Sequence, residues 1–281
     1  MNLHTHTNYC DGNCDPVEYY EKAIELNWEY IGFSAHAPLP IQCDWDVDIN
    51  DVNHYINELN SLRKHYKNKI QSYIGWEIDF LYGRGFPALE NEYIQKADFF
   101  VCSIHYLPIL TTNNTIIEYI EIDGTFDEFN RLYTYYNKNI TEVLDLYLLN
   151  LNSMLNIHID KTKIIGHIDK IVINAEKYPE FKQIKSSFYN TIFELLKTYS
   201  SESFVLEINT RGIYNKNRNN PYPAFEFIEL IKDSNFQIML NSDAHHPCEL
   251  DQGFEQVKNY LFKNKIELNM IDHGYFSKIT H

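Results

Sequence analysis

Short apolar runs alternate with longer segments of mixed polarity along almost the whole chain. The runs are rich in Ile, Val, Phe and Tyr, and their length and composition are typical of buried strands. We therefore expect seven strands, at residues 1–7, 30–34, 70–78, 98–104, 163–166, 203–209 and 236–241.

The segments between these runs have the character of amphipathic helices. Between residues 51 and 66, for example, apolar side chains recur every three or four positions. Asp15 is a suitable N-cap, and Pro16 occupies the first helical position after it. We expect helices at residues 16–26, 51–66, 126–157 (as one or two helices), 179–200, 221–233 and 251–263.

Strands that alternate with helices in this way indicate an α/β protein with a parallel sheet. An odd number of short strands favours a distorted (β/α)7 TIM-like barrel over the regular eightfold barrel. The length of 281 residues is normal for one barrel, and no linker rich in Gly, Ser or Pro interrupts it. We expect a single domain over residues 1–281.

Residues that can bind metals stand at the ends of the predicted strands. His4 and His6 share one face of the first strand, because strand residues two apart point the same way. In a parallel barrel the carboxyl ends of the strands carry the functional site. The other polar residues at strand ends are His36, Glu77, His105, His167, Arg211, Asp243 and His245.

Each of these residues, taken alone, has an ordinary structural alternative. His36 could be a loop histidine, His105 a hydrogen-bonded core residue and Glu77 a surface carboxylate. Asp243 could cap a turn, and Arg211 could form a salt bridge with a carboxylate at the rim. Their joint occurrence at strand ends favours a shared site. The histidines predicted to be solvated on helices or the tail are His54, His65, His158, His273 and His281.

The net charge of −15 argues against nucleic acid or an anionic membrane as a partner, although a small phosphate ester remains compatible with it. Five cysteines at irregular positions suggest free thiols in a reducing cytosol. A soft metal site at Cys10 and Cys14 is the weaker alternative. No apolar stretch has membrane-spanning length and no signal peptide is evident, so we predict a cytoplasmic protein.

Eight motifs in chain order resemble those of the PHP (polymerase and histidinol phosphatase) superfamily. The resemblance runs from residue 2 to about residue 260 and is closest to the monofunctional histidinol-phosphate phosphatases. Ile122-Asp123-Gly124 and the following long helix strengthen that closer match. The motifs are His4-Thr5-His6, Tyr9-Cys10-Asp11-Gly12, Phe33-Ser34-Ala35-His36, Gly75-Trp76-Glu77-Ile78-Asp79, Ser103-Ile104-His105-Tyr106-Leu107, Gly166-His167-Ile168-Asp169, Leu206-Glu207-Ile208-Asn209-Thr210-Arg211 and Ser242-Asp243-Ala244-His245.

The resemblance implies a distorted (β/α)7 barrel with three divalent metal ions at the carboxyl ends of its strands. Six histidines and three carboxylates suit Zn, Fe or Mn better than Mg. Some relatives have His at the position of Asp11. The implied ligand groups are His4, His6, Glu77 and Asp243 for the first ion, Glu77, His105 and His167 for the second, and Asp11, His36 and His245 for the third.

A phosphate monoester dianion needs cationic groups around it in the transition state. Metal ions can bind its oxygens and lower the pKa of a bridging water, so that hydroxide attacks phosphorus in line. We predict Glu77, Asp243 and Arg211 as catalytic residues. Arg211, Lys170 and His105 are the predicted substrate-binding residues.

One departure from the family pattern concerns the phosphate grip. Family members often carry an Arg a few residues after the Gly-His-x-Asp motif, and this chain has none there. Lys170, Arg84 or Arg218 are the candidates for a second phosphate clamp. An acidic, aromatic rim would suit an imidazole and an amine, and the candidate residues for it are Asp44, Trp45, Asp46, Asp79, Phe80 and Tyr106.

The leading hypothesis is hydrolysis of L-histidinol phosphate to L-histidinol and phosphate, as in histidine biosynthesis. A first alternative is a PHP phosphoesterase that acts on a nucleotide or another small phosphate ester. A second is a non-catalytic metal-binding domain. The expected partner in the leading hypothesis is a small-molecule phosphate monoester, and the oligomeric state stays open.

Overall fold

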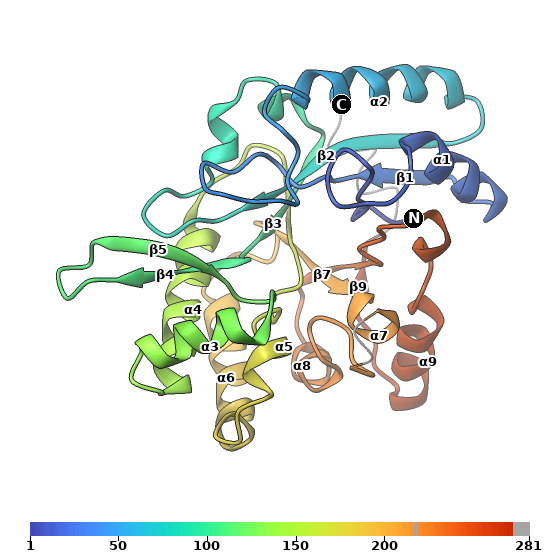
Figure 1. Cartoon of the computed structure of the whole chain (residues 1–281). Helices are drawn as coiled ribbons and strands as arrows, with labels where there is room; N and C mark the ends of the chain where they lie inside the picture. Colours follow the sequence, from blue (N-terminus) through green and yellow to red (C-terminus); the bar gives the residue numbers. More distant parts are fainter. Residues whose placement is uncertain (216–217, 272–281) are drawn as a thin grey trace.

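The computed structural model describes residues 1–215 and 218–271 and contains one large parallel sheet. The strand order is β1-β2-β3-β6-β7-β8-β9, and the sheet curls into a half-barrel with helices outside it (Figure 1). This confirms the predicted α/β class and the distorted barrel. Its strands are β1 (Tyr30–Phe33), β2 (Gln71–Asp79), β3 (Phe99–Ser103), β6 (Thr162–Ile165), β7 (Val205–Asn209), β8 (Gln237–Asn241) and β9 (Asn269–Met270).

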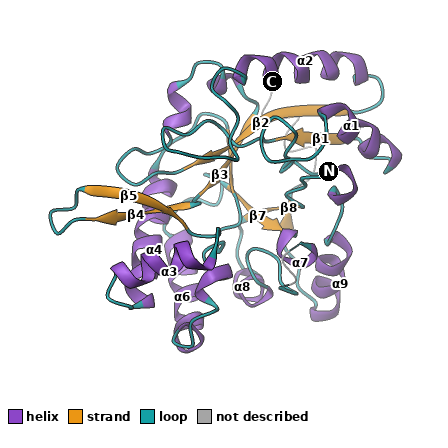
Figure 2. Ribbon diagram, in the orientation of Figure 1, coloured by secondary structure: helices purple, strands orange, loops and turns teal. Residues whose placement is uncertain are grey.

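The helices follow the predicted segments closely, as the ribbon in Figure 2 shows. The long segment 126–157 forms two helices, because Asn137 and Lys138 adopt positive φ and the Asn139 side chain caps a new helix. The α-helices are α1 (Pro16–Glu25), α2 (Val52–Tyr66), α3 (Phe126–Tyr135), α4 (Ile140–Asn156), α5 (Val172–Ala175), α6 (Phe181–Lys197), α7 (Arg211–Tyr214), α8 (Phe225–Ile231) and α9 (Phe254–Asn264). The 3₁₀ turns are η1 (Pro87–Glu90), η2 (Ile94–Lys96) and η3 (Pro247–Glu249).

The prediction of a strand at residues 1–7 is wrong. This extended segment lies between β1 and the end of β8, and it forms only an isolated bridge from Thr5 to Ala244. Several of its backbone N–H groups donate to side chains instead of a ladder: Leu3 to Asn241, and Thr5 to Ser34. The seventh strand of the sheet is instead the two-residue β9, which the sequence pattern did not reveal.

An antiparallel hairpin follows β3 and was also not predicted. It consists of β4 (Tyr106–Leu110) and β5 (Ile116–Glu121), and it extends away from the main sheet above α3 and α4 in the view of Figure 1. Its outer strand is only partly buried, so it lacks the continuous apolar run that marks the central strands. The hairpin brings the end of β5 back towards His105, whose carbonyl accepts a hydrogen bond from the Ile122 N–H.

The inner face of the sheet changes from apolar to polar towards the carboxyl ends of the strands. Before the polar layer, the inner face carries a buried apolar cluster, which consists of Leu3, Tyr73, Phe99, Val101, Ile164, Val205 and Met239. Two residues further along the same strands stand Ser103 on β3 and Glu207 on β7, and these polar side chains are buried. Because strand residues two apart share a face, the apolar cluster supports a polar site directly above it.

Among residues 1–215 and 218–271, no helix is long and apolar enough to cross a bilayer. His54, His65 and His158 are exposed, as predicted, whereas His273 and His281 lie outside the described residues. The prediction of a single domain over the whole chain stays a prediction.

Candidate metal centre

A cavity of about 370 Å³ opens at the carboxyl ends of the parallel strands. Seven of the nine predicted ligands line it, and the other two, His4 and His6, are fully buried behind it. Predicted substrate contacts also reach it. Its lining residues are Asp11, His36, Trp45, Glu77, His105, Glu121, Asp123, Gly124, Thr125, His167, Lys170, Arg211, Asp243 and His245.

Glu77, on β2, lies at the centre of the histidine cluster and is almost fully buried. Its carboxylate oxygens lie within 3.7 Å of ring nitrogens from five histidines. The shortest of these contacts, each 2.9 Å, are to Nε2 of His4 and Nε2 of His167. Ser103 on the neighbouring strand donates its hydroxyl to Oε1 of the same carboxylate, the oxygen that His167 also contacts.

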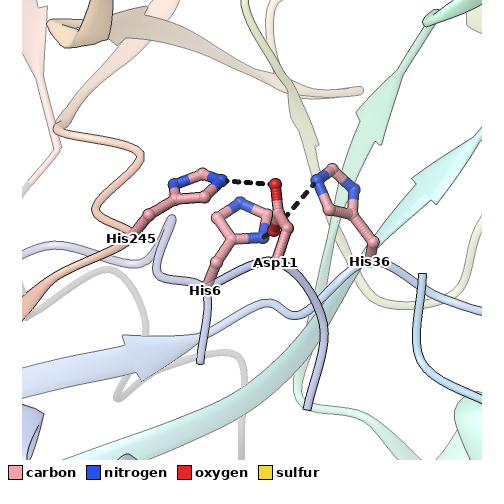
Figure 3. A group of neighbouring side chains, drawn as sticks. All are labelled: His6, Asp11, His36 and His245. Carbon is pink, nitrogen blue, oxygen red and sulfur yellow. Dashed lines mark hydrogen bonds and ion pairs between the residues drawn. The ribbon is translucent and has the colours of Figure 1, made fainter. Parts of the chain in front are cut away.

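Asp11 belongs to a second group, with His6, His36 and His245 (Figure 3). Its Oδ2 lies 2.9 Å from His245 Nε2, and its Oδ1 lies 3.6 Å from His6 Nδ1 and 3.8 Å from His36 Nε2. The Asp11 loop folds back so tightly that a Cβ on Gly12 would approach the His6 carbonyl to 2.5 Å. Glycine is therefore required here for steric reasons.

Asp243 follows β8 in a left-handed conformation, with φ of 56°. Such a backbone is unfavourable for a residue with a side chain and often occurs at functional sites. Its Oδ1 lies 3.2 Å from His6 Nε2 and 3.7 Å from His4 Nε2. Asn209 at the end of β7 donates a hydrogen bond to Oδ2.

Two carboxylates orient the predicted ligands, a role that the sequence did not predict for either; Asp79 was expected at the rim and Glu207 was given no role. Glu207 accepts a hydrogen bond from His4 Nδ1 at 2.8 Å and another from the His167 backbone N–H. Asp79 accepts from both Nδ1 and the backbone N–H of His105. Such contacts fix which ring nitrogen of a histidine faces a metal. The sequence does mark Glu207 and Asp79 as unusual, because each is a charged residue within an otherwise apolar, buried strand.

The donor set is suited to divalent metal ions. Ring nitrogens and carboxylate oxygens form four overlapping groups, within each of which the donor atoms lie within 4.8 Å of one another. Among the described residues, buried His6 Nε2 and His36 Nδ1 have no hydrogen-bond partner, although carboxylate oxygens lie 3.2–3.3 Å away. Metal coordination would satisfy these atoms.

Electrostatics in the cavity divide the proposed ligands. Burial would lower the pKa of His4, His6 and His105, but neighbouring carboxylates outweigh it and raise the pKa of His4 and His105 to about 10 and that of His6 well above its usual value. These three rings would release a proton on binding a metal ion.

Burial alone would raise the pKa of Glu77, but the surrounding imidazoles, that of His4 foremost, outweigh burial and hold that pKa well below its usual range. Burial lowers the pKa of His36, His167 and His245, so these rings are neutral with a free lone pair. The carboxylate is thus ionised, and these imidazoles are able to coordinate a metal.

Two cationic side chains face the same cavity. Arg211 donates a hydrogen bond to the Asp243 carbonyl at 2.8 Å. It also lies 3.5 Å from the Glu249 carboxylate, so it forms the salt bridge that was expected as its alternative role. Lys170 Nζ is buried, 3.5 Å from Asp123 and 3.9 Å from Asp243.

The other candidates for a phosphate clamp lie elsewhere. Arg84 is exposed, and Arg218 pairs with Glu176 and stacks on Tyr222. Neither lines the cavity.

The predicted rim is realised only in part. Trp45 lines the cavity, and its ring stacks on that of Tyr106. Asp79 is buried behind His105 and Phe80 packs in the core, because both belong to the buried length of β2 and its continuation. All five cysteines are free, and none of the candidate metal groups among the described residues includes one.

Comparison with known proteins identifies the family. The PHP domain model matches residues 2–211, and the chain belongs to this family. A histidinol-phosphatase of Bacillus subtilis is 22% identical over 265 residues, covering 90% of this chain and 96% of that protein.

Two solved structures share the fold. A Listeria monocytogenes protein described as a candidate histidinol phosphatase aligns with a TM-score of 0.74 at 22% identity, covering 91% of this chain and 98% of its own. Histidinol phosphate phosphatase from Lactococcus lactis, crystallised with zinc, L-histidinol and phosphate, aligns with a TM-score of 0.65 at 21% identity over 95% and 94% of the two chains. At these identities the structural likeness concerns the fold alone.

Proposed function

We propose that this chain hydrolyses L-histidinol phosphate to L-histidinol and phosphate at a site for three divalent metal ions. The observation that carries the proposal is the cluster of six histidines and three carboxylates beside the buried Lys170 and the partly buried Arg211, all at one end of the barrel. The substrate is inferred from the Bacillus relative and from the ligands of the Lactococcus structure. The reaction would serve histidine biosynthesis.

We assign the three ligand groups as the family resemblance implies. His4, His6, Glu77 and Asp243 form the first group, Glu77, His105 and His167 the second, and Asp11, His36 and His245 the third. The donor groups in the structure overlap this assignment at three histidines. His6 also lies against the third group and stacks on His245 with ring centroids 4.2 Å apart, His36 also lies with Glu77 and His105, and His167 also lies with His4 and Asp243. Zinc, manganese and iron all suit these donors.

The bound ions would supply Lewis acidity and a water of lowered pKa. Arg211 and Lys170 would hold phosphate oxygens and offset their charge, Arg211 through a bidentate fork and Lys170 as a point charge. His105, oriented by Asp79, would face the substrate from the opposite wall. Glu207 and Asn209 would keep His4 and Asp243 in place.

We also place the protein in the cytoplasm, because its five thiols are all free and the reaction is biosynthetic. No nucleic acid is required as a partner, in keeping with the net charge of −15.

The test is phosphate release by the metal-loaded protein from L-histidinol phosphate, nucleoside monophosphates and bis-p-nitrophenyl phosphate. We expect kcat/KM for L-histidinol phosphate to exceed the others by at least 100-fold, about 2.7 kcal/mol of discrimination. A preference for a nucleotide or the diester would refute the substrate assignment. No turnover of any substrate would favour a non-catalytic metal-binding domain.

A further inference from the structure

Lys170 needs support from its surroundings if it is to hold a phosphate. A lysine side chain has four rotatable bonds and a compact charge, so its own geometry does not fix its direction. Its Nζ lies 3.5 Å from Asp123 Oδ2 and 3.9 Å from Asp243 Oδ2. These separations are longer than those of directed hydrogen bonds, so the two carboxylates attract the ammonium without orienting it.

The aromatic ring of Tyr222 lies against the same ammonium. Lys170 Nζ stands over the ring, 5.4 Å from its centroid, and Tyr222 is fully buried. Because Lys170 is buried too, water weakens this cation–π contact little. The contact is also directional, since the attraction acts over the face of the ring.

The backbone and packing around Tyr222 hold its ring in place. Tyr222 and Asn209 exchange two backbone hydrogen bonds, of 2.7 and 2.8 Å, at an isolated bridge at the end of β7. The ring packs on Gly212 of α7, where a Cβ would lie 3.0 Å from Tyr222 Cε2. Asn209 also donates to Asp243, so the ring is tied to a part of the proposed metal centre.

A second cation, Arg218, stands over the same ring, with its Cζ 4.6 Å from the ring centroid. Its guanidinium lies 3.2 Å from the Glu176 carboxylate, which compensates its charge. Arg218 does not line the metal cavity, whereas Lys170 does. Of the two cations on this ring, Lys170 is therefore the one that faces a phosphate in the cavity.

The hydroxyl of Tyr222 takes no part in this arrangement. It is buried and has no hydrogen-bond partner of normal geometry among the described residues. The face of the ring is therefore the part of Tyr222 that acts on Lys170, and a phenylalanine ring should be able to replace it.

We propose that Tyr222 is a positioning residue for phosphate binding, whose ring directs the Lys170 ammonium into the metal cavity. Unlike the planar fork of an arginine, an ammonium does not fix its own direction at a phosphate, and the ring supplies that direction. The inference rests on the proposed phosphatase function. It concerns a residue outside the lining of the metal cavity.

The test is a double-mutant cycle between Tyr222 and Lys170. Tyr222→Leu removes the ring face, Tyr222→Phe keeps it, and Lys170→Met removes the cation but keeps an unbranched side chain. Phe227→Leu is the control, because it exchanges a ring for leucine at a fully buried position of α8 outside the metal cavity. The measured quantity is the dissociation constant of inorganic phosphate, from calorimetric titration into zinc-loaded protein.

We expect Tyr222→Leu to weaken phosphate binding roughly 5- to 30-fold, as for the loss of a desolvated cation–π contact. Tyr222→Phe should stay within about threefold of wild type, because it keeps the ring face. Phe227→Leu should bind phosphate as wild type does. In the Lys170→Met background, Tyr222→Leu should change the constant by less than about twofold, because the cation that the ring orients is gone.

A merely structural role for the ring would give the same loss with and without Lys170, and that result would overturn the proposal. An unchanged constant in Tyr222→Leu would do so too, as would an equal loss in Tyr222→Phe or in Phe227→Leu. Elemental analysis should find the same zinc content in all variants. Zinc lost from Tyr222→Leu would also overturn the proposal, because the ring would then act through the metal ligands.

Phosphate titration requires no turnover, so it separates this proposal from the proposed function. If wild-type protein binds phosphate but does not hydrolyse L-histidinol phosphate, and the cycle shows coupling, the phosphatase assignment fails and the role of Tyr222 holds. If wild-type protein hydrolyses the ester and the cycle shows no coupling, the role of Tyr222 fails alone. Absence of phosphate binding to wild type would also overturn it.

Discussion

Replacement of Glu77 by Gln should remove two metal ions at once. Glu77 touches five imidazoles and is the one residue that we assign to two ions, whereas His245 belongs to a single group of donors. Gln has nearly the same volume and can still accept the Ser103 hydroxyl, so packing should persist. The change is therefore chiefly the loss of one buried negative charge.

The expected magnitude follows from Coulomb's law. At an effective dielectric constant of about 20, a carboxylate and a divalent ion about 4 Å apart attract by about 8 kcal/mol. Desolvation and relaxation cancel most of that attraction. If about 3 kcal/mol remains for each ion, the affinity for each of two ions falls roughly 100-fold.

The assay is elemental analysis after dialysis against limiting zinc, alongside phosphate release from L-histidinol phosphate. Glu77→Gln should lose two of the three proposed ions and its activity should fall to background, whereas His245→Ala should chiefly lose one ion. Circular dichroism checks that both variants are folded. Full metal content and near-normal turnover in Glu77→Gln would refute the bridged arrangement.

Three further outcomes are expected. Arg211→Ala should lower kcat/KM for the phosphate ester roughly 100-fold with unchanged metal content, because the side chain faces the phosphate position and not a metal; unchanged kcat/KM would make Arg211 structural. Gly12→Ala should displace the Asp11 loop and lower the occupancy of one ion, measured by elemental analysis, since its Cβ would meet the His6 backbone. A thiol reductant that does not chelate metals should leave activity unchanged, since all five cysteines are free, and a large loss would show that a disulfide is needed.

The strands that could be predicted from the sequence are those whose apolar composition matches their burial in the folded protein. The apolar runs at β2, β3, β7 and β8 are buried on both faces, and they were recognisable for that reason. The first seven residues do not form a strand, because the backbone N–H groups of Leu3 and Thr5 donate to the side chains of Asn241 and Ser34 and not to the backbone of a neighbouring strand. No local pattern encodes such partners.

The candidate site was predictable to the extent that its residues stand at strand ends. His36 and Glu77 illustrate this, since parallel strands bring their ends together whatever the details of packing. Asp79 was expected at the rim of the cavity, but its carboxylate binds Nδ1 of His105. Which way this carboxylate faces depends on the side-chain geometry of His105, which the sequence does not reveal. Glu121 was missed because the hairpin that returns it to the cavity was not predicted.

The most direct test of the metal centre is anomalous diffraction from crystals of zinc-loaded protein grown with phosphate. We expect three peaks within the cluster of six histidines and three carboxylates, with Glu77 between two of them and phosphate in contact with Arg211 and Lys170. Zinc bound only outside this cluster, or phosphate bound away from it, would show that these residues do not form the metal centre.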